Sequence, residues 1–231
     1  MSDAKDANNK MVATTEGLTS DAFHRLLDLA ITGRGKLLGA RAIANNQLRH
    51  QQNHENAIRG LSNQHIALAG GQGFATNWGG FLLSLVTIPA NMAAAAFIQA
   101  RAVAGIAHLR GYELDDPRVR TAILVVMLGP RGSAALIAAG DLPSSAAAVA
   151  TAPAFDPRLD SRVSRALLEQ SMNHVGGKRL GVFLAKKIPL VGGGVGAVVD
   201  GWSTHSIIQY AQEQFVSRRP RSAGYAVIVE N

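Results

Sequence analysis

Apolar residues recur at spacings of three and four along most of the chain, which is the repeat of α-helices buried on one side. Ser20 and Asp21 suit the start of a helix, and the apolar positions that follow are Phe23, Leu26, Leu27, Ala30 and Ile31. Glycines at 33, 35 and 39 interrupt this pattern. A second helix is predicted from about Arg41 to Ala69, with a broad polar side rich in Asn, Gln and His.

The middle of the chain predicts a longer and more apolar helical run, from about residue 76 to residue 109. Pro89 lies inside this run and is expected to kink it, because proline removes one backbone donor. Gly111 is a natural stop.

Two acidic residues followed by proline predict where the next helix begins. Asp115 or Asp116 can cap free amides, and Pro117 suits the first turn. This helix is expected to reach Leu128, where a Gly-Pro pair divides it from a short apolar helix that ends near Gly140.

The last third of the chain predicts a loop over 141–157 and then more helices. Asp160 or Ser161 is expected to start a helix to about His174, glycines 176 and 177 allow a break, and two further pieces are separated near Pro189. No pair of segments combines strand alternation with a hairpin turn. The fold class expected is all-α, a single helical bundle of about six to eight helices with Pro-kinked, Ala/Gly-rich central helices.

Composition supports one folded unit with loose ends. The 231 residues are 47% hydrophobic, so they can bury a sizeable core. We expect a disordered lead-in over 1–19, a helical domain over 20–217 and a basic and apolar tail over 218–231. Cysteine is absent, which excludes disulfides and thiolate chemistry. No pattern predicts a cofactor, a metal or a catalytic residue.

The charge is uneven along the chain. The net charge is +7, and residues 157–231 carry ten basic against five acidic side chains. This excess favours an anionic partner. By contrast, residues 60–100 contain no Asp, Glu, Lys or Arg, so this stretch is either buried or in contact with something apolar.

The most apolar window, 78–98, is long enough to span a bilayer. Its large apolar residues contribute only about −4 kcal/mol towards insertion, and Pro89, Asn91 and Ser84 oppose it. A membrane span, burial in the bundle and reversible membrane contact all stay open. We predict a core hairpin that can open rather than a permanent span.

A basic cluster lies just before the predicted break near Pro189. On a helix, Lys178, Arg179, Lys186 and Lys187 occupy one half of the wheel, and Phe183 projects among them. Cations beside apolar residues are what a helix needs to lie on an anionic lipid surface. The alternatives are a solvated face of a core helix and nucleic acid; nucleic acid is not expected because Tyr and Trp stacking residues are missing.

Other candidate chemistry is weaker. His50 and His54 lie four apart, with His65 as a third ligand to consider, but the sequence lacks a metal-site motif. The glycines from Gly192 to Gly196 lack the strand and the Gly-Lys-Ser of a phosphate loop, so a close helix contact explains them better. Ser133 lacks the flanking glycine of a nucleophile elbow.

Four segments together resemble the EcsC family of bacterial proteins, over about residues 20–216. They are Gly73–Gly80 with Phe74, Ile88–Asn91 with Pro89, Ala104–Pro117 with Gly111, Tyr112 and Asp116, and Leu184–Gly193 with Pro189 and Gly192. The resemblance implies an α-helical bacterial protein that is peripheral to or embedded in a membrane. The namesake of the family is encoded beside an ABC transporter, and no catalytic residues come with the family.

These observations lead to one expected function and one alternative. We expect a non-enzymatic accessory protein, cytoplasmic or peripheral on the inner face of the cell membrane, whose partners are an anionic lipid surface and a membrane transporter. The alternative is a hydrolase with a non-motif site between helices. The sequence does not identify a small-molecule ligand.

Overall fold

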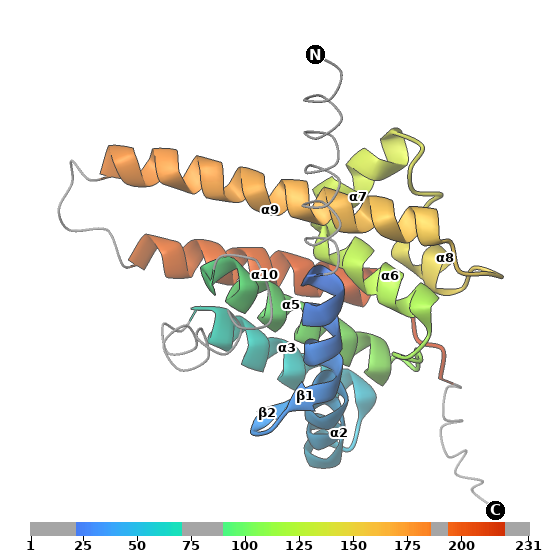
Figure 1. The fold of residues 1–231 in the computed structure, drawn as a ribbon. Helices are drawn as coiled ribbons and strands as arrows, with labels where there is room; N and C mark the ends of the chain where they lie inside the picture. Colours follow the sequence, from blue (N-terminus) through green and yellow to red (C-terminus); the bar gives the residue numbers. More distant parts are fainter. Residues whose placement is uncertain (1–21, 71–89, 186–193, 220–231) are drawn as a thin grey trace, which may run out of the picture.

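The computed structural model describes residues 22–70, 90–185 and 194–219, with side chains for 22–70, 93–171 and 203–219. Within these residues, a helix over 22–32 comes first, followed by a small hairpin and then by further helices (Figure 1). The elements after the first helix are β1 (Gly33–Arg34), β2 (Leu37–Leu38), α2 (Ala40–Gln51), α3 (His54–Gly70), α5 (Ala90–Leu109), α6 (Pro117–Met127), α7 (Gly129–Ala138), α8 (Ala146–Ala150), α9 (Pro157–Ala185) and α10 (Gly194–Gln214).

Helix α5 lies in the middle of the bundle and packs against α2, α3, α6 and α10 (Figure 1). Its positions from Ala100 to Ala107 are all buried. Small residues let the neighbouring helices approach closely: a Cβ at Gly105 would lie 2.6 Å from Cδ1 of Leu61 in α3. The alanine-rich and glycine-containing sequence of α5 therefore sets the spacing of the bundle.

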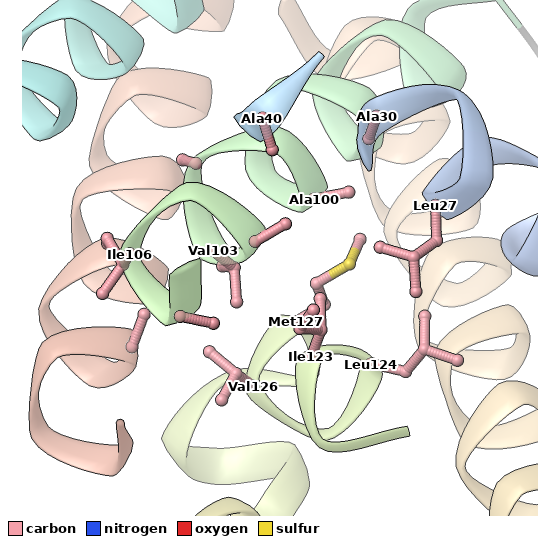
Figure 2. Close-up of a cluster of buried hydrophobic side chains, with 14 of the residues drawn as sticks. Leu27, Ala30, Ala40, Ala100, Val103, Ile106, Ile123, Leu124, Val126 and Met127 are labelled. Carbon is pink, nitrogen blue, oxygen red and sulfur yellow. The ribbon is translucent and has the colours of Figure 1, made fainter. Parts of the chain in front are cut away.

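The second central helix is α6, which is buried on all sides from Thr121 to Met127. Figure 2 shows Met127 between α5 and the helix of residues 22–32, where it faces Leu27 and Ala100. Helix α9 crosses one side of the molecule and packs on α6, whereas α2 and the hairpin lie on the opposite side (Figure 1). The molecule is thus layered around α5 and α6.

The all-α prediction is confirmed, as are several helix boundaries. The apolar positions predicted for the first helix, from Phe23 to Ile31, are buried. Asp116 caps α6 by accepting the Arg118 amide at 2.9 Å, and Pro117 opens the helix. Gly111 follows α5 with a φ of +89°, a left-handed conformation that favours glycine. The described residues contain nine helices, more than the six to eight expected.

The prediction of one helix over 41–69 is wrong, because this stretch forms α2 and α3. Gln52 adopts a left-handed conformation, with φ of 55°, and its amide donates to Leu48 O at 2.8 Å to close α2. Asn53 then caps α3, since its Oδ1 accepts the Glu55 amide at 2.8 Å. Gln52 and Asn53 thus end one helix and start the next. The apolar spacing of this stretch continues through both residues and does not reveal the break.

The predicted helix end near His174 and the break at glycines 176 and 177 are also wrong. Helix α9 starts earlier, at Pro157, where Asp156 caps the Arg158 amide at 2.8 Å, and its backbone continues to Ala185. Two glycines weaken a helix by about 2 kcal/mol but do not forbid it.

Two smaller features were also not predicted. The loop over 141–157 contains α8, which Ser145 caps through the Ala148 amide. The pairing of Gly33 with Leu38 in β1 and β2 is a minimal antiparallel ladder in a chain expected to lack strand pairs.

Part of the predicted central hairpin, residues 76–89 with Pro89, lies outside the described residues, and α5 begins directly afterwards. Within the described helices, none alone has the length and apolar composition of a membrane span. Helices α6 and α7 pass this test only as a pair, and the chain bends by 109° between them.

Candidate functional site

The predicted basic cluster is only partly covered by the structure. Lys178, Arg179 and Phe183 lie on the unbroken backbone of α9, although their side chains are not described. Lys186 and Lys187 lie outside the described residues. The part of α9 whose side chains are described packs on the body through its start, where Leu159, Val163 and Leu167 are buried.

Some of the residues that carry the family resemblance are described by the structure, and others are not. Those between α5 and α6 form a tight turn, in which Tyr112 is 1% exposed and its ring meets the Phe215 ring edge-on at 5.0 Å. Hydrogen bonds from Arg118 hold the pKa of Asp116 below its usual range, so the cap of α6 stays ionised. The motif residues that lie outside the described part of the chain are Gly73, Phe74, Gly80, Pro89, Pro189 and Gly192.

The most unusual chemistry in the described part of the chain is a buried arginine bonded to a buried histidine. Arg101 on α5 is 5% exposed, and its Nε donates to Nε2 of His65 on α3 at 3.1 Å. Nδ1 of His65 in turn donates to Leu61 O at 2.8 Å, which assigns the proton to Nδ1 and leaves Nε2 as the acceptor. The ring is fully buried, so both nitrogens are satisfied inside the protein.

The remaining surroundings of Arg101 are apolar or backbone. Its Nη1 lies 3.4 Å from Leu38 O in β2, at the long end of the hydrogen-bond range. Its guanidinium lies 5.1 Å from the centre of the Phe97 ring, a distance that allows a cation–π contact. One arginine therefore connects α5 with α3 and with the hairpin.

Burial and mutual repulsion determine the charge of this pair. Burial, together with the Arg101 charge, lowers the pKa of His65 to about 4, so the imidazole is neutral at neutral pH. Burial also lowers the pKa of Arg101 to about 10, which leaves the guanidinium protonated at neutral pH. The pair thus carries one positive charge inside the bundle.

Further polar contacts lie along the same helices. Gln212 on α10 donates to the Ser62 hydroxyl at 3.3 Å, and Ser62 donates to Ile58 O at 2.7 Å. Gln99 on α5 and Thr204 on α10 are 3.4 Å apart. The interface of α3, α5 and α10 therefore contains uncharged polar groups in addition to Arg101.

A second polar cluster joins the helix of residues 22–32, α6 and α9. Nε2 of His24 lies 2.9 Å from Oδ2 of Asp160, and the Thr121 hydroxyl donates to Oδ1 at 2.6 Å. Burial alone would raise the pKa of Asp160, but these two bonds and the nearby positive charges hold that pKa below its usual range. Because the hydroxyl contacts the carboxylate and not the ring, this is not the arrangement of a catalytic triad.

An open pocket of about 330 Å³ lies beside this cluster, between the starts of α6 and α9 and helix α8. Arg118 and Arg162 line it, and each is already paired with a carboxylate, Asp116 and Asp141 respectively. The lining of the pocket therefore contains both arginine and aspartate side chains.

The remaining sequence candidates are separated or have structural roles. His50 ends up on α2 and His54 on α3, while His65 is bonded to Arg101. No group of three His, Asp or Glu side chains that could hold a metal occurs among the described residues. Ser133 is buried and donates to Val125 O at 2.9 Å, so its hydroxyl holds the bend between α6 and α7.

Sequence reasoning missed Arg101 and His65 as partners. One signal was present: Arg101 is the first charged residue after the uncharged stretch 60–100, and His65 is inside that stretch. An isolated cation at the end of a buried segment is a candidate for a functional side chain. Their pairing depends on how α3 packs against α5.

Comparison with known proteins gives one result. No curated protein and no solved structure matches the chain significantly. The model of the EcsC protein family matches residues 3–219, which is nearly the whole chain and includes every helix described above. The chain therefore belongs to the EcsC protein family.

Proposed function

We propose that this protein is a non-enzymatic accessory protein that binds the anionic inner face of the membrane peripherally, through the end of α9 and the residues after it. The observation that carries this proposal is the single unbroken helix from Pro157 to Ala185. Its N-terminal half lies along α6, and its C-terminal half extends past α6, α7 and α8 (Figure 1). A long helix that extends past its packing partners can present its end to another surface.

The register of α9 adds a second argument. Eighteen residues make five helical turns, so positions 180 and 183 fall on the side of α9 where Arg162 and Arg165 are exposed. These positions are leucine and phenylalanine, and position 179, eighteen residues after the exposed Ser161, is arginine. On the helical side that is exposed at the start of α9, the sequence therefore places apolar residue types next to a cation, as an interfacial helix requires.

The hydrolase alternative gains no specific support from the described side chains, because the Thr121 hydroxyl and the Ser133 hydroxyl are bonded to a carboxylate and to a carbonyl. The link to a membrane transporter stays a prediction from the family resemblance.

Vesicle sedimentation tests the proposal. The wild-type chain is expected to bind vesicles that contain phosphatidylglycerol, to bind phosphatidylcholine vesicles poorly, and to lose affinity as salt rises. A variant with Lys178, Arg179, Lys186 and Lys187 changed to Gln is expected to bind about two to three orders of magnitude more weakly, at about 1 kcal/mol per cation.

A matched control removes the same number of charges elsewhere. Arg25, Lys36, Arg131 and Arg158 are exposed on other parts of the surface, and changing them to Gln is expected to alter binding little. If the wild-type chain does not bind anionic vesicles, or if both quadruple variants bind equally well, the proposal is wrong.

A further inference from the structure

The positive charge of Arg101 is not neutralised by any side chain in the described part of the chain. The ion pairs found there involve other arginines and His24, and none includes Arg101. Its histidine partner is neutral and cannot compensate the charge. A buried charge without a counter-ion is expensive for a protein to keep.

The sequence on either side does not supply a counter-ion. Residues 60–100, which include most of α3 and the first part of α5, contain no Asp or Glu. Glu55 and Asp115, at either end of the α3 to α6 region, are paired with Arg110 and Arg41. Arg101 is therefore buried as a cation, while Glu55 and Asp115 form ion pairs with other arginines.

The geometry leaves one edge of the guanidinium available. Nε is bonded to His65 and the ring of Phe97 lies near the group, whereas Nη1 has only the 3.4 Å contact with Leu38 O. No described residue accepts a hydrogen bond from Nη2. The Nη1–Nη2 edge is the side of arginine that holds the two oxygens of a carboxylate or phosphate.

Two described residues near the guanidinium have apolar side chains, Phe97 and Leu38. Phe97 is fully buried, and Leu38, whose carbonyl contacts Arg101, has a side chain that is 48% exposed on the hairpin. A small anion would lose water on binding here, and it has no apolar part that could contact these two side chains. An oxyanion attached to an aliphatic chain fits both the guanidinium edge and its apolar neighbours.

We propose that Arg101, oriented by His65, is the binding site for the carboxylate or phosphate head of a small amphipathic molecule. The site is on α5, apart from the end of α9, and goes beyond the membrane-binding function. His65 acts as a positioning residue, because it fixes the guanidinium through Nε and leaves the opposite edge for the ligand.

Thermal unfolding of the full chain with sodium decanoate, below its micelle concentration and without vesicles, tests this site. At decanoate a hundredfold above its Kd, the wild-type midpoint is expected to rise by about 5–10 °C. Decanol, acetate and inorganic phosphate at the same concentration are expected to give little shift. An equal shift with decanol would exclude the charge contact, and an equal shift with acetate or phosphate would exclude the apolar part.

Two variants separate binding from folding. Arg101→Met is expected to abolish the decanoate shift, and Arg101→Lys, which keeps the charge without the fork, to weaken decanoate binding at least tenfold. Arg120→Met, which removes an arginine paired with Asp28 at the surface, is the control and is expected to keep the full shift. A full shift in both Arg101 variants would overturn the proposal.

A measurement on the wild-type chain does not depend on these variants folding. With decanoate labelled with ¹³C at the carboxyl group, the bound signal is expected to stay at the ionised position more than one pH unit below the midpoint of free decanoate, because Arg101 favours the anion. A bound carboxyl that titrates like the free acid, or no bound signal at all, would contradict the site.

Discussion

The guanidinium of Arg101 connects three parts of the fold through partners that carry no negative charge. It donates to the His65 ring on α3, approaches the backbone of β2 and lies near Phe97 on its own helix. His65 can accept this bond only while it is neutral. The protonation state of one buried ring is therefore coupled to the integrity of the bundle.

This coupling predicts how stability depends on pH. The pKa of His65 is about 4 in the folded protein and near 6.5 when the chain is unfolded, so between these values the unfolded state binds the extra proton. The free energy of unfolding is therefore expected to fall by about 2 kcal/mol as the pH drops from 7 to 4.5. His65→Gln is expected to remove this contribution, as measured by urea unfolding at both pH values.

The control for this measurement is His205→Gln, because His205 is exposed. This variant is expected to keep the wild-type pH dependence. If the free energy of unfolding depends on pH in His65→Gln as it does in the wild type, His65 takes up its proton equally in the folded and unfolded states.

The junction between α2 and α3 shows how two neighbouring residues can divide a helical pattern. Gln52 takes the left-handed conformation at the end of α2, and Asn53 caps the amides at the start of α3. The division allows α3 to turn and place His65 against α5. The functional candidate thus depends on a helix break that the apolar spacing does not reveal.

Gln52→Gly is expected to stabilise the protein by about 0.5–1 kcal/mol, because glycine adopts the positive φ of this position without strain. His50→Gly, two residues earlier on α2, is the matched control and is expected to destabilise by a similar amount. Urea unfolding of both variants measures the difference. Destabilisation by Gln52→Gly would mean that α2 continues through this position.

The molecule as a whole is built on two buried helices whose neighbours are tied together by polar contacts at the periphery. His24 and Asp28, on the helix of residues 22–32, pair with Asp160 and Arg120. Arg219, after α10, donates to the last carbonyls of α5, Leu109 O at 3.0 Å and His108 O at 3.1 Å. The first and last described segments therefore both hold the central helices in place.

This arrangement predicts that α5, whose first part belongs to the uncharged stretch, is closed in water. A cysteine at Val103, which is fully buried, is expected to react with a water-soluble thiol reagent at least about a hundredfold more slowly than one at Ala138, which is exposed on α7. Reaction at Val103 requires an opening that costs several kcal/mol. Equal labelling rates in buffer without lipid would mean that the closed bundle is wrong.

The family resemblance read from four short segments is confirmed, and so is the all-α fold, because both rest on information close together in the chain. The cap at Asp116 and the left-handed Gly111 are set by backbone bonds within about four residues, which a sequence displays directly. The same locality explains why the first helix was predicted from its apolar positions.

Only the tertiary structure decided the rest. Whether α9 ends at glycines 176 and 177 or continues to Ala185 is a balance of about 2 kcal/mol that propensity alone does not settle. The pairing of Arg101 with His65 joins residues that are 36 positions apart, and it exists because α3 and α5 pack closely at Gly105 and Leu61. A charge becomes buried, and so acquires a possible function, only when helices distant in sequence close around it.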